Sequence, residues 1–283
     1  MIDPVDAIES VRSGPDAPNR RLVTITPPSQ VRAMVYYLRA YRRTWRASIM
    51  STFINPTLYL LAMGVGLGSF VDKGANTTSL GSITYLQFVA PALAATAAAT
   101  TATNESLYPI MGAFKWQKTY YAMLSTPLGV GDVLASQLLW IATRIAMAVG
   151  AYLVVMTAFG ATLSPWAVAV LPVGILTGMA FSAPLVAYAI TQDSENSFAL
   201  VFRLGLVPLF LFSGVFFPIS QLPAAVRWIA YVTPLWHGVA LCRDLSLGQV
   251  TAGPALVHVA VLSVFVLVGV FAANRNFHRR LLT

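Results

Sequence analysis

Six long apolar stretches constrain this chain more than any other feature of its sequence. Each has about 20 residues, and at a rise of about 1.5 Å per residue a helix of this length crosses a hydrocarbon core of about 30 Å. Arg144 and Arg203 are the charged residues inside them. The sequence therefore predicts an all-α integral membrane protein with six transmembrane helices. The expected spans cover residues 49–70, 83–103, 133–158, 166–190, 198–217 and 254–273.

The composition and the distribution of charge support this prediction. The chain is 57% apolar and 10% charged, with a mean hydropathy of +0.70, whereas soluble domains carry about a quarter charged residues. The net charge of +8 does not indicate nucleic acid binding, because many of the basic residues precede the first span and others, Arg275 among them, follow the last. Lys and Arg mark the cytoplasmic side of a membrane protein, so both termini are expected there. The basic residues before the first span are Arg12, Arg20, Arg21, Arg32, Arg39, Arg42, Arg43 and Arg46.

The residues before the first span divide into two parts. Residues 1–29 combine acidic residues and prolines without apolar periodicity, which is typical of a flexible tail, here cytoplasmic, and they lack the apolar core of a signal peptide. Residues 30–46 alternate apolar and basic residues at helical spacing. This pattern predicts an amphipathic interface helix in contact with membrane lipids; a solvated basic helix face is the alternative. The basic residues of this helix that we expect near lipid phosphates are Arg39, Arg42, Arg43 and Arg46.

The second span consists mostly of alanine and threonine. Small side chains allow close helix approach, which lipid contact does not require. Tight packing against other helices is one use of this composition, and threonine hydroxyls along a substrate path are the other. Of the two charged span residues, Arg144 is expected to serve a function at a protein or water contact. For Arg203, snorkelling to the inner surface and a role in a pathway both remain open.

A polar interruption at residues 112–133 separates the second and third spans. It contains two lysines and three aromatic residues within seven positions, and it lies on the side expected to be cytoplasmic. Residues 112–119 imitate a phosphate-binding loop, but Gln117 replaces the required glycine and no buried strand precedes it. We therefore expect no ATP site and no cofactor in this chain, and a docking surface for a separate motor protein instead. The docking residues predicted are Lys115, Trp116, Lys118, Tyr120 and Tyr121.

Residues 219–250 are too polar to span the membrane and too apolar to extend freely into water. Short re-entrant helices between the fifth and sixth spans fit both properties. The sequence offers little chemistry for an enzyme: Cys242 is the single cysteine, and the histidines at 237, 258 and 278 are dispersed. A secondary carrier would place acidic residues at mid-bilayer, and none is found there. A scaffold subunit that does not transport remains an alternative.

Several stretches together resemble a known family. The segments NESLYPIMGAFKWQKTYYAMLSTPL, LFSGVFFPISQLP and TPLWHGVALCRDL occur in order at residues 104–128, 211–223 and 233–245. They are similar to the membrane permeases of bacterial exporters driven by an ATP-binding cassette, the ABC-2 type, and within it to the nodulation-factor and daunorubicin export branch. The resemblance covers the chain from Val31 to its C-terminus and makes residues 30–283 the permease domain.

The resemblance implies a function and a set of partners. Such a permease is itself non-catalytic and lies in the bacterial inner membrane. It pairs with a second permease copy or a paralogue and with two copies of a separate ABC ATPase subunit, which binds the ATP and magnesium. The family's coupling helix maps onto residues 115–123, and its outer aromatic gate maps onto Phe216 and Phe217. The implied substrates are amphipathic: drugs, lipids or lipid-linked sugars.

Overall fold

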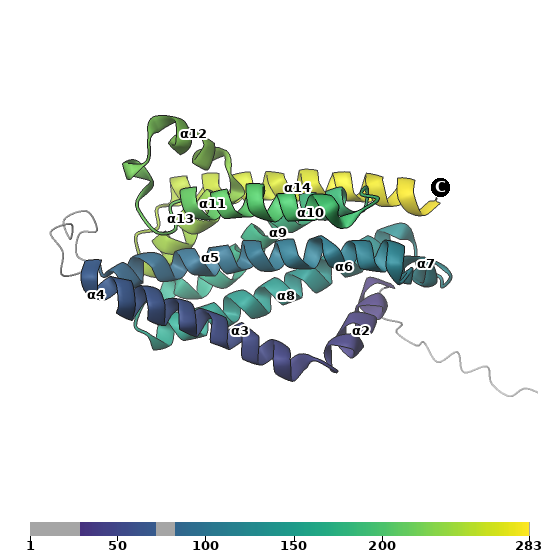
Figure 1. Ribbon diagram of the computed structural model, residues 1–283, viewed down its shortest axis with the longest axis horizontal. Coiled ribbons are helices and arrows are strands. Elements are labelled where there is room, and N and C mark those ends of the chain that lie inside the picture. Colours follow the sequence, from purple (N-terminus) through teal and green to yellow (C-terminus); the bar gives the residue numbers. More distant parts are fainter. Residues whose placement is uncertain (1–28, 72–82, 283) are drawn as a thin grey trace, which may run out of the picture.

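The computed structural model describes residues 29–71 and 83–282, and this part of the chain is built from helices without strands (Figure 1). The predicted fold class, an all-α integral membrane protein, is confirmed. The tail predicted at residues 1–29 lies outside the described residues except for Ser29. Lys73, which the positions of the first two expected spans place in an outer loop, also lies outside them.

The helices follow one another with short connections. The first half contains α2 (Ser29–Tyr41), α3 (Trp45–Leu60), the π-helix η1 (Leu61–Leu67), α4 (Gly68–Val71), α5 (Tyr85–Ser106), α6 (Tyr108–Met111), the π-helix η3 (Gly112–Trp116), α7 (Thr119–Leu124) and α8 (Val130–Ala158). The second half contains the 3-10 helix η4 (Pro165–Ala169), α9 (Val170–Ala189), η5 (Glu195–Ser197), α10 (Phe198–Leu200), the π-helix η6 (Val201–Leu206), α11 (Val207–Phe212), η7 (Ile219–Gln221), α12 (Ala224–Val232), α13 (Pro234–Leu247) and α14 (Ala252–Leu282).

Within the described residues, five helical segments are long and apolar enough to cross a membrane. They are Trp45–Val71, Val130–Ala158, Pro165–Ala189, Glu195–Phe212 and Ala252–Leu282. The segment expected as the second span, α5, is not among them. Its 22 residues are long enough, but alanine and threonine are less apolar than leucine or valine. The count of six spans therefore stays a prediction.

The core forms where α9 packs against α5, α8, α13 and α14. Glycines bring these helices unusually close together. A Cβ added at Gly178 of α9 would lie 2.7 Å from Ile145 Cδ1 of α8, and one at Gly269 of α14 would lie 2.6 Å from the backbone nitrogen of Pro184 in α9. Helices in membranes associate through such close backbone contact, so these glycines fix the spacing of the bundle.

Replacing Gly269 with valine should destabilise the bundle by about 1–3 kcal/mol, because the new side chain would overlap the backbone of α9. The measurement is the unfolding temperature of the detergent-solubilised protein. Gly253 of the same helix provides the matched control, since nothing lies within 4 Å of a Cβ added there. A Gly269→Val protein that is as stable as Gly253→Val would contradict the close packing of α9 and α14.

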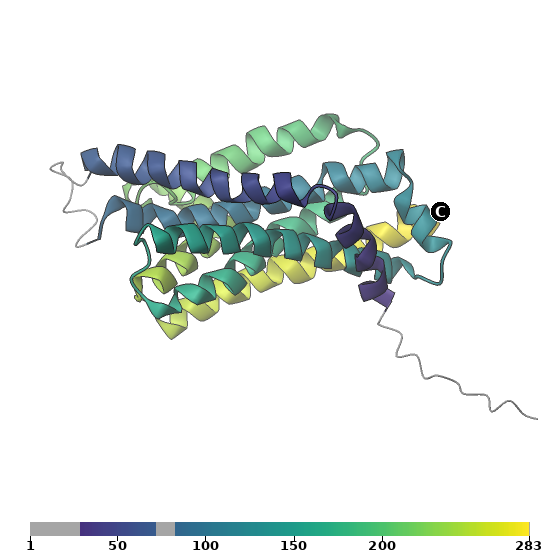
Figure 2. The same ribbon diagram turned by 90° about the horizontal axis from the view of Figure 1, so that it is seen from below.

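The two ends of the bundle differ in what they carry (Figures 1 and 2). The interface helix α2, the short helix α7 and the C-terminus lie at one end, while α4, α12 and α13 lie at the other. Short helices between the fifth span and the last were predicted, and α12 and α13 confirm them. Along α13 the side chains of Leu235, Val239 and Cys242 are buried, whereas Trp228 and Ile229 of α12 are exposed.

The helix α2 is shorter than the interface helix predicted for residues 30–46. It ends at Tyr41, where Arg43 and Thr44 donate their backbone N–H groups to the carbonyls three residues earlier, at 3.2 and 2.9 Å. Such bonds tighten and end the last turn. Arg39 therefore lies on α2, Arg42 and Arg43 lie in the turn after it, and Arg46 begins α3; all four are exposed.

Candidate functional site

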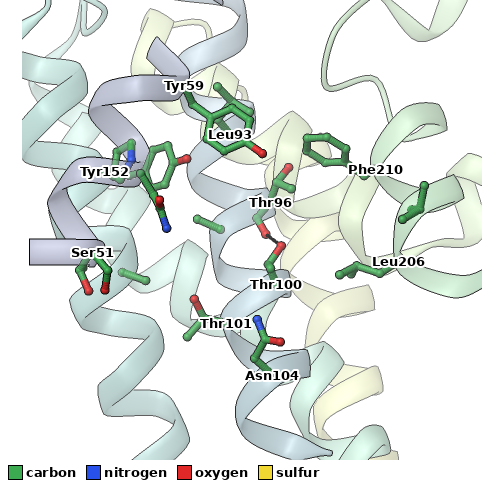
Figure 3. Close-up of a pocket in the computed structure, with 16 residues that line it drawn as sticks. Ser51, Tyr59, Leu93, Thr96, Thr100, Thr101, Asn104, Tyr152, Leu206 and Phe210 are labelled. Carbon is green, nitrogen blue, oxygen red and sulfur yellow. Dashed lines mark hydrogen bonds between the residues drawn. The ribbon is translucent and has the colours of Figure 1, made fainter. Parts of the chain in front are cut away.

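A groove of about 440 Å³ lies between α3, α5, α8 and the segment of η6 and α11 (Figure 3). Polar side chains of α5 line one wall, and Tyr59 of α3 and Phe210 of α11 stand at its rim in the close-up. The wall is thus partly polar and partly apolar. The side chains that give it this mixed character are Thr96, Thr100, Thr101, Asn104, Leu93, Tyr152, Leu206 and Phe210.

The alanines and the threonines of α5 lie in different surroundings. Most of its alanines, including Ala94, Ala95 and Ala98, are fully buried, as tight helix packing requires. Thr96, Thr100 and Thr101 line the groove, where the Thr96 hydroxyl donates to the Ala92 carbonyl at 2.9 Å and the Thr100 hydroxyl to the Thr96 carbonyl at 2.8 Å. These bonds satisfy the hydroxyl protons and leave oxygen lone pairs for a ligand.

Two sides of this groove belong to spans that are little buried. The most apolar window of the first span is 18% buried and that of the fifth is 6% buried, against 44% for Pro165–Ala189. Exposed apolar residues such as Leu204 and Val207 cover the fifth span. Arg203 is also exposed on it. This face must be covered by lipid or by another subunit.

A side chain that the sequence did not single out holds the loop after α11. Arg243 of α13 donates to the carbonyls of Phe88 at 3.0 Å and Gly214 at 2.8 Å, and its guanidinium lies 3.8 Å from the centre of the Phe88 ring. Burial lowers the pKa of Arg243 to about 10, so it stays protonated at neutral pH. The carbonyl dipoles and the Phe88 ring compensate the positive charge of Arg243. No residue spacing in the sequence reveals these contacts.

The predicted gate residues Phe216 and Phe217 follow this loop and are half-buried. The rings of Phe216 and Phe210 lie 4.9 Å apart, edge to face, which places Phe216 next to a residue that lines the groove. The Tyr85 hydroxyl donates to the Phe216 carbonyl at 3.3 Å. Phe210 and Phe216 therefore form an aromatic pair beside the groove, and the hydrogen bond from Tyr85 connects this pair to the start of α5.

Arg144 forms an ion pair with Glu105, with 2.8 Å between Nε and Oε1. Its guanidinium also lies 5.2 Å from the centre of the Tyr41 ring of α2. One turn earlier on α8, Trp140 packs against Tyr37 and Tyr41 of that helix. Arg144 thus lies close to α2. Its contacts with Glu105 and the Tyr41 ring reduce the free-energy cost of placing a charge in the membrane.

Breaking this pair should destabilise the protein by about 1–3 kcal/mol, because both side chains are about one-fifth exposed, at 21% and 19%. We expect Glu105→Gln and Arg144→Met each to lower the unfolding temperature. The double variant Glu105→Arg with Arg144→Glu should recover part of the loss. Equal stability of the wild type and both single variants would show that the pair contributes nothing.

The predicted docking segment is not one continuous helix. The π-helix η3 ends at Trp116, and Lys118 adopts a left-handed conformation with φ of +53° before α7 begins at Thr119. A left-handed residue breaks a helix, so the single helix implied for residues 115–123 is wrong. Lys115, Trp116 and Lys118 are exposed, and the Lys115 amine donates to the Asp193 carbonyl.

Tyr120 and Tyr121 differ, although they are neighbours. Tyr120 is completely buried, its hydroxyl donates to Gln137 Oε1 at 3.2 Å, and its ring lies 5.5 Å from that of Phe277 in α14. The prediction that Tyr120 contacts a partner is therefore wrong, because it anchors α7 within this chain. Tyr121 is 40% exposed and stays available to a partner.

Comparison with known proteins decides the family. The model of the ABC-2 type transporter family matches residues 30–247. The chain belongs to this family. It is 32% identical over 243 residues to nodulation protein J of Rhizobium leguminosarum bv. viciae, covering 86% of this chain and 91% of that protein. It is 29% identical over 243 residues to nodulation protein J of Rhizobium meliloti, covering 86% of this chain and 90% of that protein.

Membership of the ABC-2 family fixes the general role of the chain. It is a multi-pass membrane protein and the transport subunit, or permease, of an ABC-2 transporter. Permeases of this family are generally non-catalytic and generally partner with an ATPase subunit.

Proposed function

We propose that this permease forms the export path for an amphipathic substrate and is driven by a separate ATPase subunit. The groove beside α5 carries the proposal. Its wall combines threonine and asparagine side chains with leucine, tyrosine and phenylalanine, which suits a molecule with a polar and an apolar part. Drugs, lipids and lipid-linked sugars share this character.

The path is completed by a second copy of the permease or by a paralogue. The groove is bordered by α3 and by η6 with α11, and the spans that contain these helices bury only 18% and 6% of their apolar windows. Two copies that meet along this face would join their grooves into one passage. Phe216 and Phe217 are then the outer gate, and Arg203 on the same exposed span snorkels to the inner surface.

The ATPase docks at the end of the bundle that carries α2, α7 and the C-terminus. Lys115, Trp116, Lys118 and Tyr121 form the docking surface, and all four are exposed. Two ATPase copies dock, and they, not the permease, bind ATP and magnesium. When they close, the docked segment moves with them, and the permease shifts toward the state that the closed ATPase binds more tightly.

This arrangement sets the orientation in the bacterial inner membrane. The exposed arginines Arg39, Arg42, Arg43 and Arg46 lie at or after α2 and face the phosphates of the inner leaflet. Arg275 and Arg279 lie near the end of α14, which ends at the same side of the bundle as α2 (Figure 2). Both termini are therefore cytoplasmic in the proposal, as the distribution of Lys and Arg predicts.

Co-purification tests the proposal. The tagged full chain is expressed together with an ABC ATPase from the same genome, isolated in detergent and reconstituted in liposomes. We expect the ATPase to remain bound and ATP hydrolysis to be inhibited by vanadate. A chain that never retains the ATPase would favour a scaffold, and uptake driven by an ion gradient without ATP would favour a secondary carrier.

A further inference from the structure

A second groove, of about 380 Å³, lies between α2, the α6–η3 segment and α8, and the path described above does not use it. Its lining contains five aromatic rings, two amides and no charged side chain. Three of the rings reach solvent: Trp116 is 56% exposed, Tyr36 46% and Tyr108 41%. Tyr37 and Trp140 form its back wall, stacked with 5.8 Å between ring centres.

From this lining we infer that the groove binds the uncharged sugar headgroup of a glycolipid in the inner leaflet. One face of a sugar ring presents C–H groups, which pack against the electron-rich face of an aromatic ring. The edges of the sugar present hydroxyls, which need hydrogen-bond partners. A groove of exposed rings with amides at its wall supplies both.

The polar groups of the groove match hydroxyls. Gln137 is 2% exposed, and its Oε1 already accepts from Tyr37 at 2.6 Å and from Tyr120 at 3.2 Å. Its remaining hydrogen-bonding capacity is the two N–H groups of the amide. Gln117 and Thr119 also line the groove and can both donate and accept. A quaternary ammonium headgroup could use the rings but none of these groups.

The charges around the groove argue against an anionic headgroup. Arg39, Arg42 and Arg43 belong to α2 or the turn after it, yet none of them lines the groove. No other Lys or Arg lines it either. A phosphate placed there would lose water without gaining a charged partner, which is costly. The hydroxyls of an uncharged headgroup lose less free energy when they leave water, and the polar side chains of the groove can replace those hydrogen bonds.

The position of the groove argues for a membrane lipid rather than a free sugar. Val35 and Leu38 of α2 are exposed, at 38% and 43%, next to the exposed Arg39. An apolar and basic exposed surface of this kind lies at the interface between headgroups and acyl chains. The groove beside α2 is then at headgroup depth, within reach of a sugar whose acyl chains stay in the bilayer.

The test uses the full chain without any ATPase. It is reconstituted in vesicles with equal amounts of monoglucosyl diacylglycerol, diacylglycerol, phosphatidylcholine and phosphatidylglycerol that share the same acyl chains. Native mass spectrometry then measures which lipids remain bound. We expect the glucosyl lipid to be retained about tenfold over diacylglycerol, a factor equivalent to about 1.4 kcal/mol.

Two variants link this preference to the groove. Tyr36→Ala and Trp116→Ala should each reduce it about five- to tenfold, and Trp116→Phe should retain most of it, since these side chains are exposed and the fold does not depend on them. Trp228→Ala, which removes a ring that is 72% exposed on α12, is the matched control and should change nothing. An unchanged preference in both alanine variants would overturn the inference.

Further outcomes distinguish the other ligand classes. Retention of phosphatidylcholine or phosphatidylglycerol as strong as that of the glucosyl lipid would also overturn it. Methyl glucoside in solution should not displace the lipid, and displacement would assign the groove to a soluble sugar instead. The inference rests on the orientation in the proposed function but not on transport, so a loss of ATP-driven export would leave this binding result unaffected.

Discussion

Reversing both docking lysines and removing the indole beside them, in Lys115→Glu, Lys118→Glu and Trp116→Ala combined, should abolish transport. Lys115 and Lys118 are exposed on either side of Trp116, so two charges of the wrong sign would meet the surface of the ATPase that receives them. Buried rings and desolvated charge pairs dominate such interfaces and cost roughly 2 kcal/mol or more each when lost. The measurement is ATP-driven translocation of a fluorescent lipid analogue in liposomes.

The control for this prediction keeps the charges. Lys115→Arg with Lys118→Arg should retain most of the activity, and all variants should insert into the membrane to the same extent, because none of these side chains is buried. Substrate-stimulated ATP hydrolysis should fall together with transport. Unchanged transport by the triple variant would reject residues 112–133 as the docking segment.

Filling the groove beside α5 should reduce transport more than tenfold without affecting assembly. Thr100 lines the groove, and a tryptophan there would occupy much of its volume of about 440 Å³. Because Lys115 and Trp116 of the docking segment do not line this groove, Thr100→Trp should still bind the ATPase. The measurement compares co-purification of the ATPase with translocation of the lipid analogue.

Thr157→Trp provides the comparison for this variant. Thr157 is exposed on α8, and its hydroxyl bonds the Leu153 carbonyl as that of Thr100 bonds Thr96. The two substitutions are therefore chemically alike and differ in location. If both reduce transport equally, the effect arises from added bulk and the groove is not the path.

Much of the fold was accessible from the sequence, because long apolar stretches admit few structures in a bilayer. The apolar helices and the short helices at α12 and α13 follow from length and polarity alone. The end of α2 at Tyr41 was not predictable in the same way, since residues 42–46 continue its apolar and basic pattern. Backbone bonds in a single turn, at Arg43 and Thr44, decided that boundary.

The candidate site was predictable where exposure alone mattered. Lys115, Trp116 and Lys118 are polar or interfacial residues outside the spans, and the structure leaves them exposed. Tyr120 has the same local sequence context as Tyr121, but its burial depends on Phe277, which is far away in the chain. The pairing of Arg144 with Glu105 and the contacts of Arg243 likewise arise between distant helices, so periodicity could not reveal them.

Photo-crosslinking at neighbouring positions tests the central claim, that an ATPase drives this permease through residues 112–133. The photoreactive residue benzoylphenylalanine replaces Trp116, Tyr121, Tyr120 or Trp228 in turn, and the full complex is illuminated in membranes. We predict crosslinks to the ATPase from positions 116 and 121, and none from the buried position 120 or from position 228 at the opposite end. Crosslinks to the ATPase from position 228 but not from 116 or 121 would contradict the account.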